Sequence, residues 1–101
     1  MSHKGSVIAL PSGVWAWDVA SPDDITIPAL SRIFAELRGG EFQFLLLGTG
    51  ATQVFPSLDI RRAFADCGIG LEIMSTGAAA RTYNVLLAEG RPVGAALLAV
   101  A

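Results

Sequence analysis

The chain lacks most of the residue types on which metal, redox and disulfide chemistry depend. Its 101 residues include one cysteine and one histidine, so no intrachain disulfide can form and no cysteine pair has zinc-site spacing. No apolar run approaches the ~20 residues that a membrane-spanning helix needs. Charged residues make up 16 % of the chain, against about 25 % in an average soluble domain. We therefore expect a cytoplasmic protein without a transmembrane segment, a metal or a cofactor.

Patterns typical of catalysis and of nucleic-acid binding are also missing. A Ser-His-Asp or Cys-His site needs a base beside its nucleophile, and the one histidine, His3, lies two residues from the N-terminus. The seven basic residues are scattered, and only Arg61 and Arg62 are adjacent, whereas nucleic-acid binding draws on clustered lysine and arginine. We expect no catalytic residue and no nucleic-acid partner.

What the chain does contain is mostly apolar. Hydrophobic residues make up 52 % of it, and its formal net charge is −2. Its length suits one domain over residues 1–101. Because a small domain has much surface to cover and this one has little charge, we expect part of its apolar surface to meet a partner or a second copy.

Short apolar runs between glycine and proline turns predict the secondary structure. The runs at 6–10 and 14–19 are separated by Pro-Ser-Gly, which indicates a β-hairpin, and Trp15 and Trp17 share one of its faces. Further on, the pattern predicts strands over 42–47, 69–74 and 93–100. It predicts helices between Thr26 and the Gly39-Gly40 pair, between Ser57 and Gly68, and from after Thr76 to about Glu89.

The apolar residues of these helices suggest how each helix packs. In the first helix, Arg32 and Glu36 lie four residues apart on the polar side and are expected to be no more than a solvated face. In the second, Cys67 falls on the apolar stripe and is expected to be buried. The third helix is apolar around most of its circumference, so we expect it to be covered on more than one side.

The order of elements, β-β-α-β-α-β-α-β, is typical of an α/β domain. It predicts a central mixed, mostly parallel sheet of about five strands, with the N-terminal hairpin at one edge and three helices packed on it. The pattern is also compatible with one antiparallel strand in this sheet.

Two loops mark a candidate binding site at the carboxyl ends of the strands, where open α/β sheets bind ligands. Gly48, Thr49 and Gly50 follow one strand, and Ser75-Thr76-Gly77 follow the next. If these strands are neighbours, the loops converge at the start of the third helix, with Arg81 nearby, and a carboxylate or phosphate could bind there. A dinucleotide site is disfavoured, because Gln53 stands where a third glycine belongs.

Glu72 lies in the middle of a predicted apolar strand, where a lone carboxylate is costly to bury. It therefore reaches an edge, takes a proton, or pairs with an arginine such as Arg81 or Arg91. A structural ion pair is the interpretation that we favour.

The stretch 70–91, GLEIMSTGAAARTYNVLLAEGR, resembles the signature G-(V/I)-E-x-M-x-T-x-A-A-x-R-T-Y-N-x-L-x-x-E-x-R, and 46–50 matches the same family. This is the small domain of unknown function that includes the third assembly factor of mitochondrial respiratory complex I. The resemblance implies an α/β fold, no established catalytic activity and, for the eukaryotic members, work at the inner membrane. Many members carry further residues before the first strand. The candidate ligand or partner site comprises Gly48, Thr49, Gly50, Glu72, Thr76, Arg81, Tyr83, Asn84 and Arg91.

Three hypotheses follow for the function. The leading one is a non-enzymatic interaction or assembly-factor-like module with a protein partner, with a peripheral link to membrane complexes. The second is a binder of a small anionic ligand at the loops 48–50 and 75–77. The third is a purely structural homo-oligomer, which a self-complementary apolar patch would distinguish.

Overall fold

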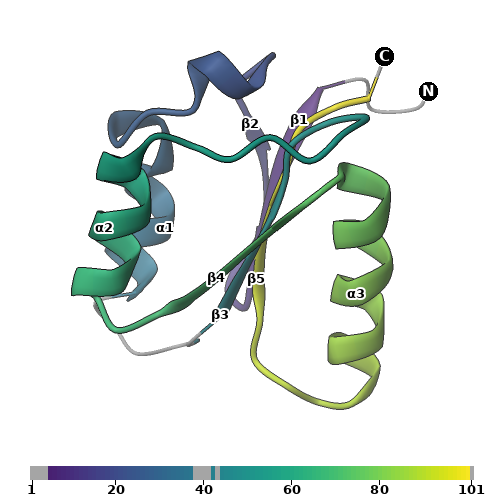
Figure 1. Cartoon of the computed structure of the whole chain (residues 1–101). Coiled ribbons are helices and arrows are strands. Elements are labelled where there is room, and N and C mark those ends of the chain that lie inside the picture. Colours follow the sequence, from purple (N-terminus) through teal and green to yellow (C-terminus); the bar gives the residue numbers. More distant parts are fainter. Residues whose placement is uncertain (1–4, 38–41, 43, 101) are drawn as a thin grey trace.

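The computed structural model describes residues 5–37, 42 and 44–100 of the chain. It contains one five-stranded sheet with helices on both faces (Figure 1). The strands lie in the order β2-β1-β5-β3-β4. The elements are β1 (Ser6–Leu10), β2 (Gly13–Trp17), the short 3-10 helices η1 (Pro22–Asp24) and η2 (Pro28–Leu30), α1 (Ser31–Leu37), β3 (Phe44–Gly48), α2 (Leu58–Asp66), β4 (Gly70–Met74), α3 (Thr76–Ala88) and β5 (Gly94–Leu97).

The sheet is mixed, and the predicted α/β class is confirmed. β3 pairs in parallel with both β4 and β5, whereas β1 pairs antiparallel with both β2 and β5. Half of the neighbouring pairs are thus antiparallel, so the expectation of a mostly parallel sheet was wrong in degree. The reason is that β1 alone runs opposite to the other four strands and lies inside the sheet, where it has two neighbours. The hairpin β1-β2 forms one edge, as predicted.

One face of the sheet carries α1 and α2 and holds most of the core. The odd-numbered residues of β3, Leu45 and Leu47, point to this face and are almost fully buried. Phe64 from α2 lies beside Phe34 from α1, with ring centroids 4.7 Å apart. Such a contact between two rings stabilises the fold beyond the effect of the apolar area that it buries. This side therefore supplies most of the hydrophobic stabilisation.

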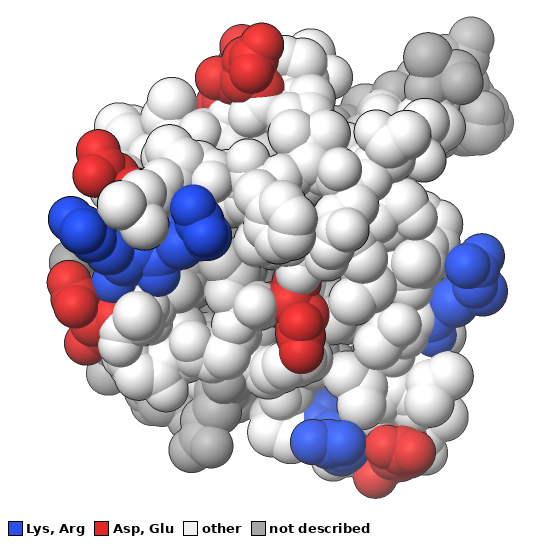
Figure 2. Space-filling view, viewed as in Figure 1, with Lys and Arg blue, Asp and Glu red and all other residues white. Residues whose placement is uncertain are grey.

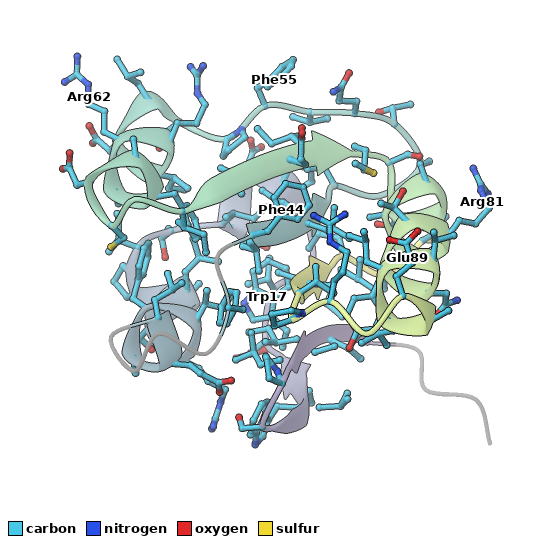
Figure 3. The ribbon with its side chains drawn as sticks, turned by 90° about the horizontal axis from the view of Figure 1, so that it is seen from below. Trp17, Phe44, Phe55, Arg62, Arg81 and Glu89 are labelled. Atoms are coloured by element: carbon cyan, nitrogen blue, oxygen red, sulfur yellow. The ribbon has the colours of Figure 1, made fainter. Side chains whose placement is uncertain are left out.

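Among the described residues, the other face is covered by one helix, α3 (Figures 1 and 3). Small residues, Ala9, Ala79 and Ala95, bring the helix close to the sheet, and Leu46 completes the contact. Only Ala79 is fully buried within α3, and the expected covering on more than one side was wrong. Three helices must serve two faces, so the side of α3 that points away from the sheet has no layer above it among the described residues.

The hairpin is attached to α1 and the turn before it by polar contacts. The indole Nε1 of Trp17 donates to the carbonyl of Ala29 at 2.8 Å, and the guanidinium of Arg32 lies 4.4 Å from the ring centroid of Trp15, a cation–π distance. Glu36 accepts hydrogen bonds from the backbone and the hydroxyl of Ser12. Arg32 is exposed and Glu36 partly so, as expected for the polar side of the helix, and both side chains also contact the hairpin.

The predicted helix ends agree with the structure where it describes them. The hydroxyl of Thr26 accepts from the Ala29 N–H at 3.3 Å, and the first helix then starts as the 3-10 turn η2. Its predicted end at Gly39-Gly40 lies outside the described residues. Gly68 and Gly90 follow α2 and α3 with φ of +72° and +74°, the left-handed conformation that ends helices and suits glycine.

Candidate functional site

The loops after β3 and β4 meet at the carboxyl edge of the sheet, as the sequence predicts. β3 and β4 are parallel neighbours, so their ends lie together. The N–H of Thr49 donates to the carbonyl of Met74 at 3.0 Å. Gly50 and Thr76 exchange two hydrogen bonds of 2.8 Å, one from the Gly50 N–H to the Thr76 hydroxyl and one from the Thr76 N–H to the Gly50 carbonyl. The two loops are thus locked to each other.

Two threonine hydroxyls extend this lock. Thr76 Oγ1 donates to the carbonyl of Leu98 at 2.7 Å, which joins the start of α3 to the chain beyond β5. Thr49 Oγ1 donates to the carbonyl of Thr52 at 2.7 Å and accepts from the N–H of Val54 at 2.9 Å. Each hydroxyl both donates and accepts, so the hydrogen-bonding capacity of both groups is largely used within the fold.

Glycine is required at position 48 for a packing reason. A Cβ on Gly48 would lie 2.8 Å from the Cα of Thr76, closer than side chains tolerate, and the contact is with backbone. Gly50 has a φ of +98°, which non-glycine residues rarely adopt. The Gly-Thr-Gly sequence is thus explained by the turn and by the close approach of α3.

Several N–H groups at the start of α3 already have partners. Thr76 donates to Gly50 as described, Ala78 donates to the Ser75 hydroxyl at 3.4 Å, and Ala79 donates to the Ser75 carbonyl at 2.9 Å. The positive end of the helix dipole remains, but three donors that an anion would use are engaged. Anion binding here stays a prediction.

Of the other predicted site residues on and after α3, Arg81 lies near this junction, because its Nη1 is 3.7 Å from the position that a Cβ on Gly77 would take. Arg81 is exposed and points away from the body of the protein (Figure 3). Asn84 is exposed as well, while Arg91 lies at the opposite end of the helix, 3.8 Å from Glu89. Tyr83 is half-buried against the α3 side of the sheet, and this burial raises the pKa of its phenol.

Glu72 is exposed, which corrects the expectation of a buried ion pair. β4 is the last strand of the sheet, and sequence reasoning alone does not tell an edge strand from a central one. The side chain lies on the α3 face, across from Leu46 of β3. Among the described residues the ion pair present is Arg91–Glu89, so Glu72 reaches an edge without an arginine partner.

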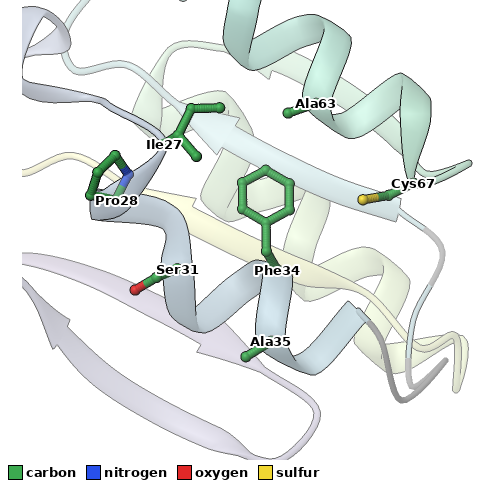
Figure 4. Close-up of a pocket in the computed structure, with 7 residues that line it drawn as sticks. All are labelled: Ile27, Pro28, Ser31, Phe34, Ala35, Ala63 and Cys67. Atoms are coloured by element: carbon green, nitrogen blue, oxygen red, sulfur yellow. The ribbon is translucent and has the colours of Figure 1, made fainter.

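A groove of about 540 Å³ separates α1 from α2 (Figure 4). The ring of Phe34 points into it, and Cys67 lies at one end. Cys67 is exposed, so its predicted burial was wrong: it follows the last residue of α2, where the helix extends beyond the packed core. The lining residues are Ile27, Pro28, Ser31, Phe34, Ala35, Ala63 and Cys67.

The structure exposes large apolar side chains that the candidate site predicted from the sequence does not include. Phe55 is 62 % exposed and projects from the loop between β3 and α2 (Figure 3). Val85 of α3 is 57 % exposed. The available sequence signal was the apolar Val54-Phe55 pair in a loop that ends at Pro56. Charged side chains occur in separate groups with wide uncharged areas between them (Figure 2).

Within residues 5–37, 42 and 44–100, no group of three or more His, Cys, Asp or Glu side chains is placed to hold a metal ion. No helix in these ranges has the length and apolar character needed to span a bilayer.

Comparisons with known proteins give a consistent result. The family model described as "Protein of unknown function (DUF498/DUF598)" matches residues 1–98. An uncharacterized protein of Rhodobacter capsulatus is 48 % identical over 95 % of this chain and 70 % of its own length. Human NADH dehydrogenase (ubiquinone) 1 alpha subcomplex assembly factor 3 is 33 % identical over 93 % of this chain and 50 % of its own.

Solved structures agree with this kinship. A crystal structure described as an outer membrane protein of Bartonella henselae superposes with a TM-score of 0.91 at 42 % identity, over all of this chain and 83 % of the other. A solution structure from Bordetella pertussis, described as an Mth938-like domain, gives a TM-score of 0.77 at 34 % identity, over 94 % of this chain and 73 % of the other. The chain spans about half the length of the assembly factors that it matches.

Proposed function

Because the chain belongs to the DUF498/DUF598 family, we propose that it is a non-enzymatic, assembly-factor-like module that binds a protein subunit of respiratory complex I before that subunit is assembled. The observation that carries the proposal is the 33 % identity to the human assembly factor across 93 % of this chain. That relative is named as an assembly factor. The kinship therefore supports a protein partner more directly than it supports a reaction.

The surface of the domain supports the same proposal. Large apolar side chains, Phe55 and Val85 among them, are exposed, and the surface has wide areas without charge (Figure 2). Exposed apolar surface of this kind marks interaction sites in small proteins. A module that binds subunits needs such a surface and needs no catalytic group.

The geometry gives less support to the anion-binding alternative. The loops 48–50 and 75–77 hydrogen-bond to each other, so donors that an anion would use are engaged, and the guanidinium of Arg81 is exposed to solvent beside Gly77. An Arg81→Ala variant tests this alternative. A thermal shift by phosphate or small carboxylates that the variant loses would favour it over the assembly role.

Deletion of the gene in cells that encode this chain tests the proposal. We expect the amount of assembled complex I and its NADH:ubiquinone reductase activity to fall, while the messenger RNAs of its subunits stay unchanged. Expression of the chain should restore both. Unchanged complex I in the deletion strain would contradict the proposed function.

A cytoplasmic location with peripheral contact to a membrane complex goes with this role. The relative from Bartonella henselae is described as an outer membrane protein, so the location needs its own test. Fractionation should recover the chain in the cytoplasm and, in part, on the inner membrane; recovery in the outer membrane alone would contradict this location.

Light scattering after size exclusion tests the homo-oligomer alternative, for which a stable dimer or tetramer without a partner is expected.

A further inference from the structure

The outer edge of β4 carries backbone groups without a partner strand. Successive residues of a strand direct their N–H and C=O groups to opposite sides. Met74 directs its carbonyl toward β3, where it accepts from Thr49. Leu71 and Ile73 therefore direct theirs away from the sheet. Unpaired groups along a sheet edge are a template for a further strand.

Only one of these outward groups is covered by a neighbouring side chain in the described part of the chain. The amide of Gln53 donates to the carbonyl of Ile73 at 2.7 Å, which covers the edge near the carboxyl end of β4. The N–H of Ile73 and both backbone groups of Leu71 have no such cover among the described residues. The edge is thus open along its first part, and an exposed glutamine, which can turn aside, closes the rest.

A small apolar cavity lies beside this edge on the α2 side. Its volume is about 210 Å³, enough for one aliphatic side chain of a strand that adds to β4. Leu71 and Ile73 point their side chains to this side and are only partly buried. The lining residues are Arg61, Phe64, Ala65, Ile69, Leu71 and Ile73.

The α3 side of the same edge presents a carboxylate. Glu72 is exposed there and has no arginine partner among the described residues. Thr82 Oγ1 lies 3.8 Å from Met74 Sδ, so that side of α3 borders β4, and the exposed Val85 lies one turn further along the helix. A strand that adds to β4 would place a residue directly across from Glu72, where an opposite charge is favourable.

We propose that the outer edge of β4 binds an extended segment of the protein partner as a sixth strand, with apolar residues toward α2 alternating with basic residues toward α3. The inference rests on the proposed function and specifies its contact surface. Main-chain hydrogen bonds from Leu71 and Ile73 give affinity, while the cavity and Glu72 select the side chains, as in other cases of strand addition.

A second copy of the chain fits this edge less well than a basic segment does. Antiparallel pairing of two β4 strands centred on position 72 would place Glu72 across from Glu72 of the other copy. Like charges directly opposite each other are destabilising. The carboxylate therefore favours a partner with lysine or arginine at this register.

A titration of the full chain labelled with ¹⁵N tests the inference. The probe is a capped nine-residue peptide of alternating valine and lysine. One control peptide has the same composition in blocks, and another has glutamate in place of lysine. We expect amide shifts and slowed hydrogen exchange at residues 70–74, and about fivefold weaker binding of the glutamate peptide, from the loss of a cross-strand charge pair. A Glu72→Lys variant should reverse this preference.

A second variant tests the backbone contact. Leu71→Pro removes an outward N–H while leaving the bonds to β3, a position where edge strands tolerate proline, and should abolish binding of the alternating peptide. If this variant does not fold, the charge reversal at position 72 still shows whether the peptide binds at the edge of β4. Shifts centred elsewhere, equal binding of the block peptide, or unchanged preference in Glu72→Lys would overturn the inference. Should these occur while deletion of the gene still lowers complex I, the proposed function stands and only its contact surface is wrong.

Discussion

The two faces of the sheet differ in what they bury. On the face of α1 and α2, large side chains such as Leu45, Leu47 and Phe64 are almost completely buried. On the face of α3, alanines fill most of the contact, and Tyr83 and Leu86 are only partly covered. The α1 and α2 side therefore supplies most of the stability, while α3 is held by fewer large buried side chains and leaves Val85 and Leu87 exposed.

The largest expected effect is a truncation on the stable side. Phe64→Ala removes a ring that is 1 % exposed and packs on Phe34, and we expect a loss of about 3–5 kcal/mol in the free energy of unfolding. The matched change on the other side, Leu86→Ala, should cost about 1.5 kcal/mol, because this side chain is only partly buried. Urea denaturation followed by circular dichroism measures both. Equal losses would remove the distinction between the faces.

A smaller effect is expected at the junction that joins α3 to the sheet. Thr76→Val keeps the shape but leaves the Leu98 carbonyl and the Gly50 N–H without the hydroxyl. We expect a loss of about 2 kcal/mol in unfolding free energy. Thr82→Val is the control, since its hydroxyl bonds only within α3 and to a methionine sulfur. If both variants lose the same small amount of unfolding free energy, the hydrogen bonds of the Thr76 hydroxyl do not hold α3 to the sheet.

Alkaline pH should weaken the α3 side in particular. Burial raises the pKa of Tyr83 above its ordinary value of 10.0, so the neutral phenol stabilises the folded state. This contribution is complete below pH 10 and is lost as the pH rises through the raised pKa. The unfolding free energy of the wild type should therefore fall more steeply above pH 10 than that of Tyr83→Phe. Parallel pH profiles would show that this phenol is as solvated as in the unfolded chain.

The smallest effect on stability is expected at the exposed apolar positions. Val85→Asn changes a side chain that is 57 % exposed, and surface changes of this kind stay within about 0.5 kcal/mol. Chemical denaturation checks the value, with Asn84→Ala as a neighbour on the same helix. A loss above 1 kcal/mol would mean that α3 packs more tightly than the burial of its residues indicates.

The sequence was most informative where a local pattern determines structure. The hairpin, the helix-ending glycines and the meeting of the loops after Gly48 and Met74 follow from turn residues and from parallel strands that share an edge. The exposure of Glu72 did not follow, because strand order is a property of the whole fold. The open side of α3 was missed for a related reason: an apolar arc on a helix shows what could be covered, while the number of available layers decides what is.

Complementation of a deletion strain with charge variants on the two sides shows which of them contacts the partner. Glu72→Lys alters the edge of β4, and Ala35→Lys places the same charge in the groove between α1 and α2, where Ala35 is exposed. We expect the chain with Ala35→Lys to restore assembled complex I, whereas the chain with Glu72→Lys, folded and equally abundant, does not. Restoration by Glu72→Lys together with failure of Ala35→Lys would contradict this expectation.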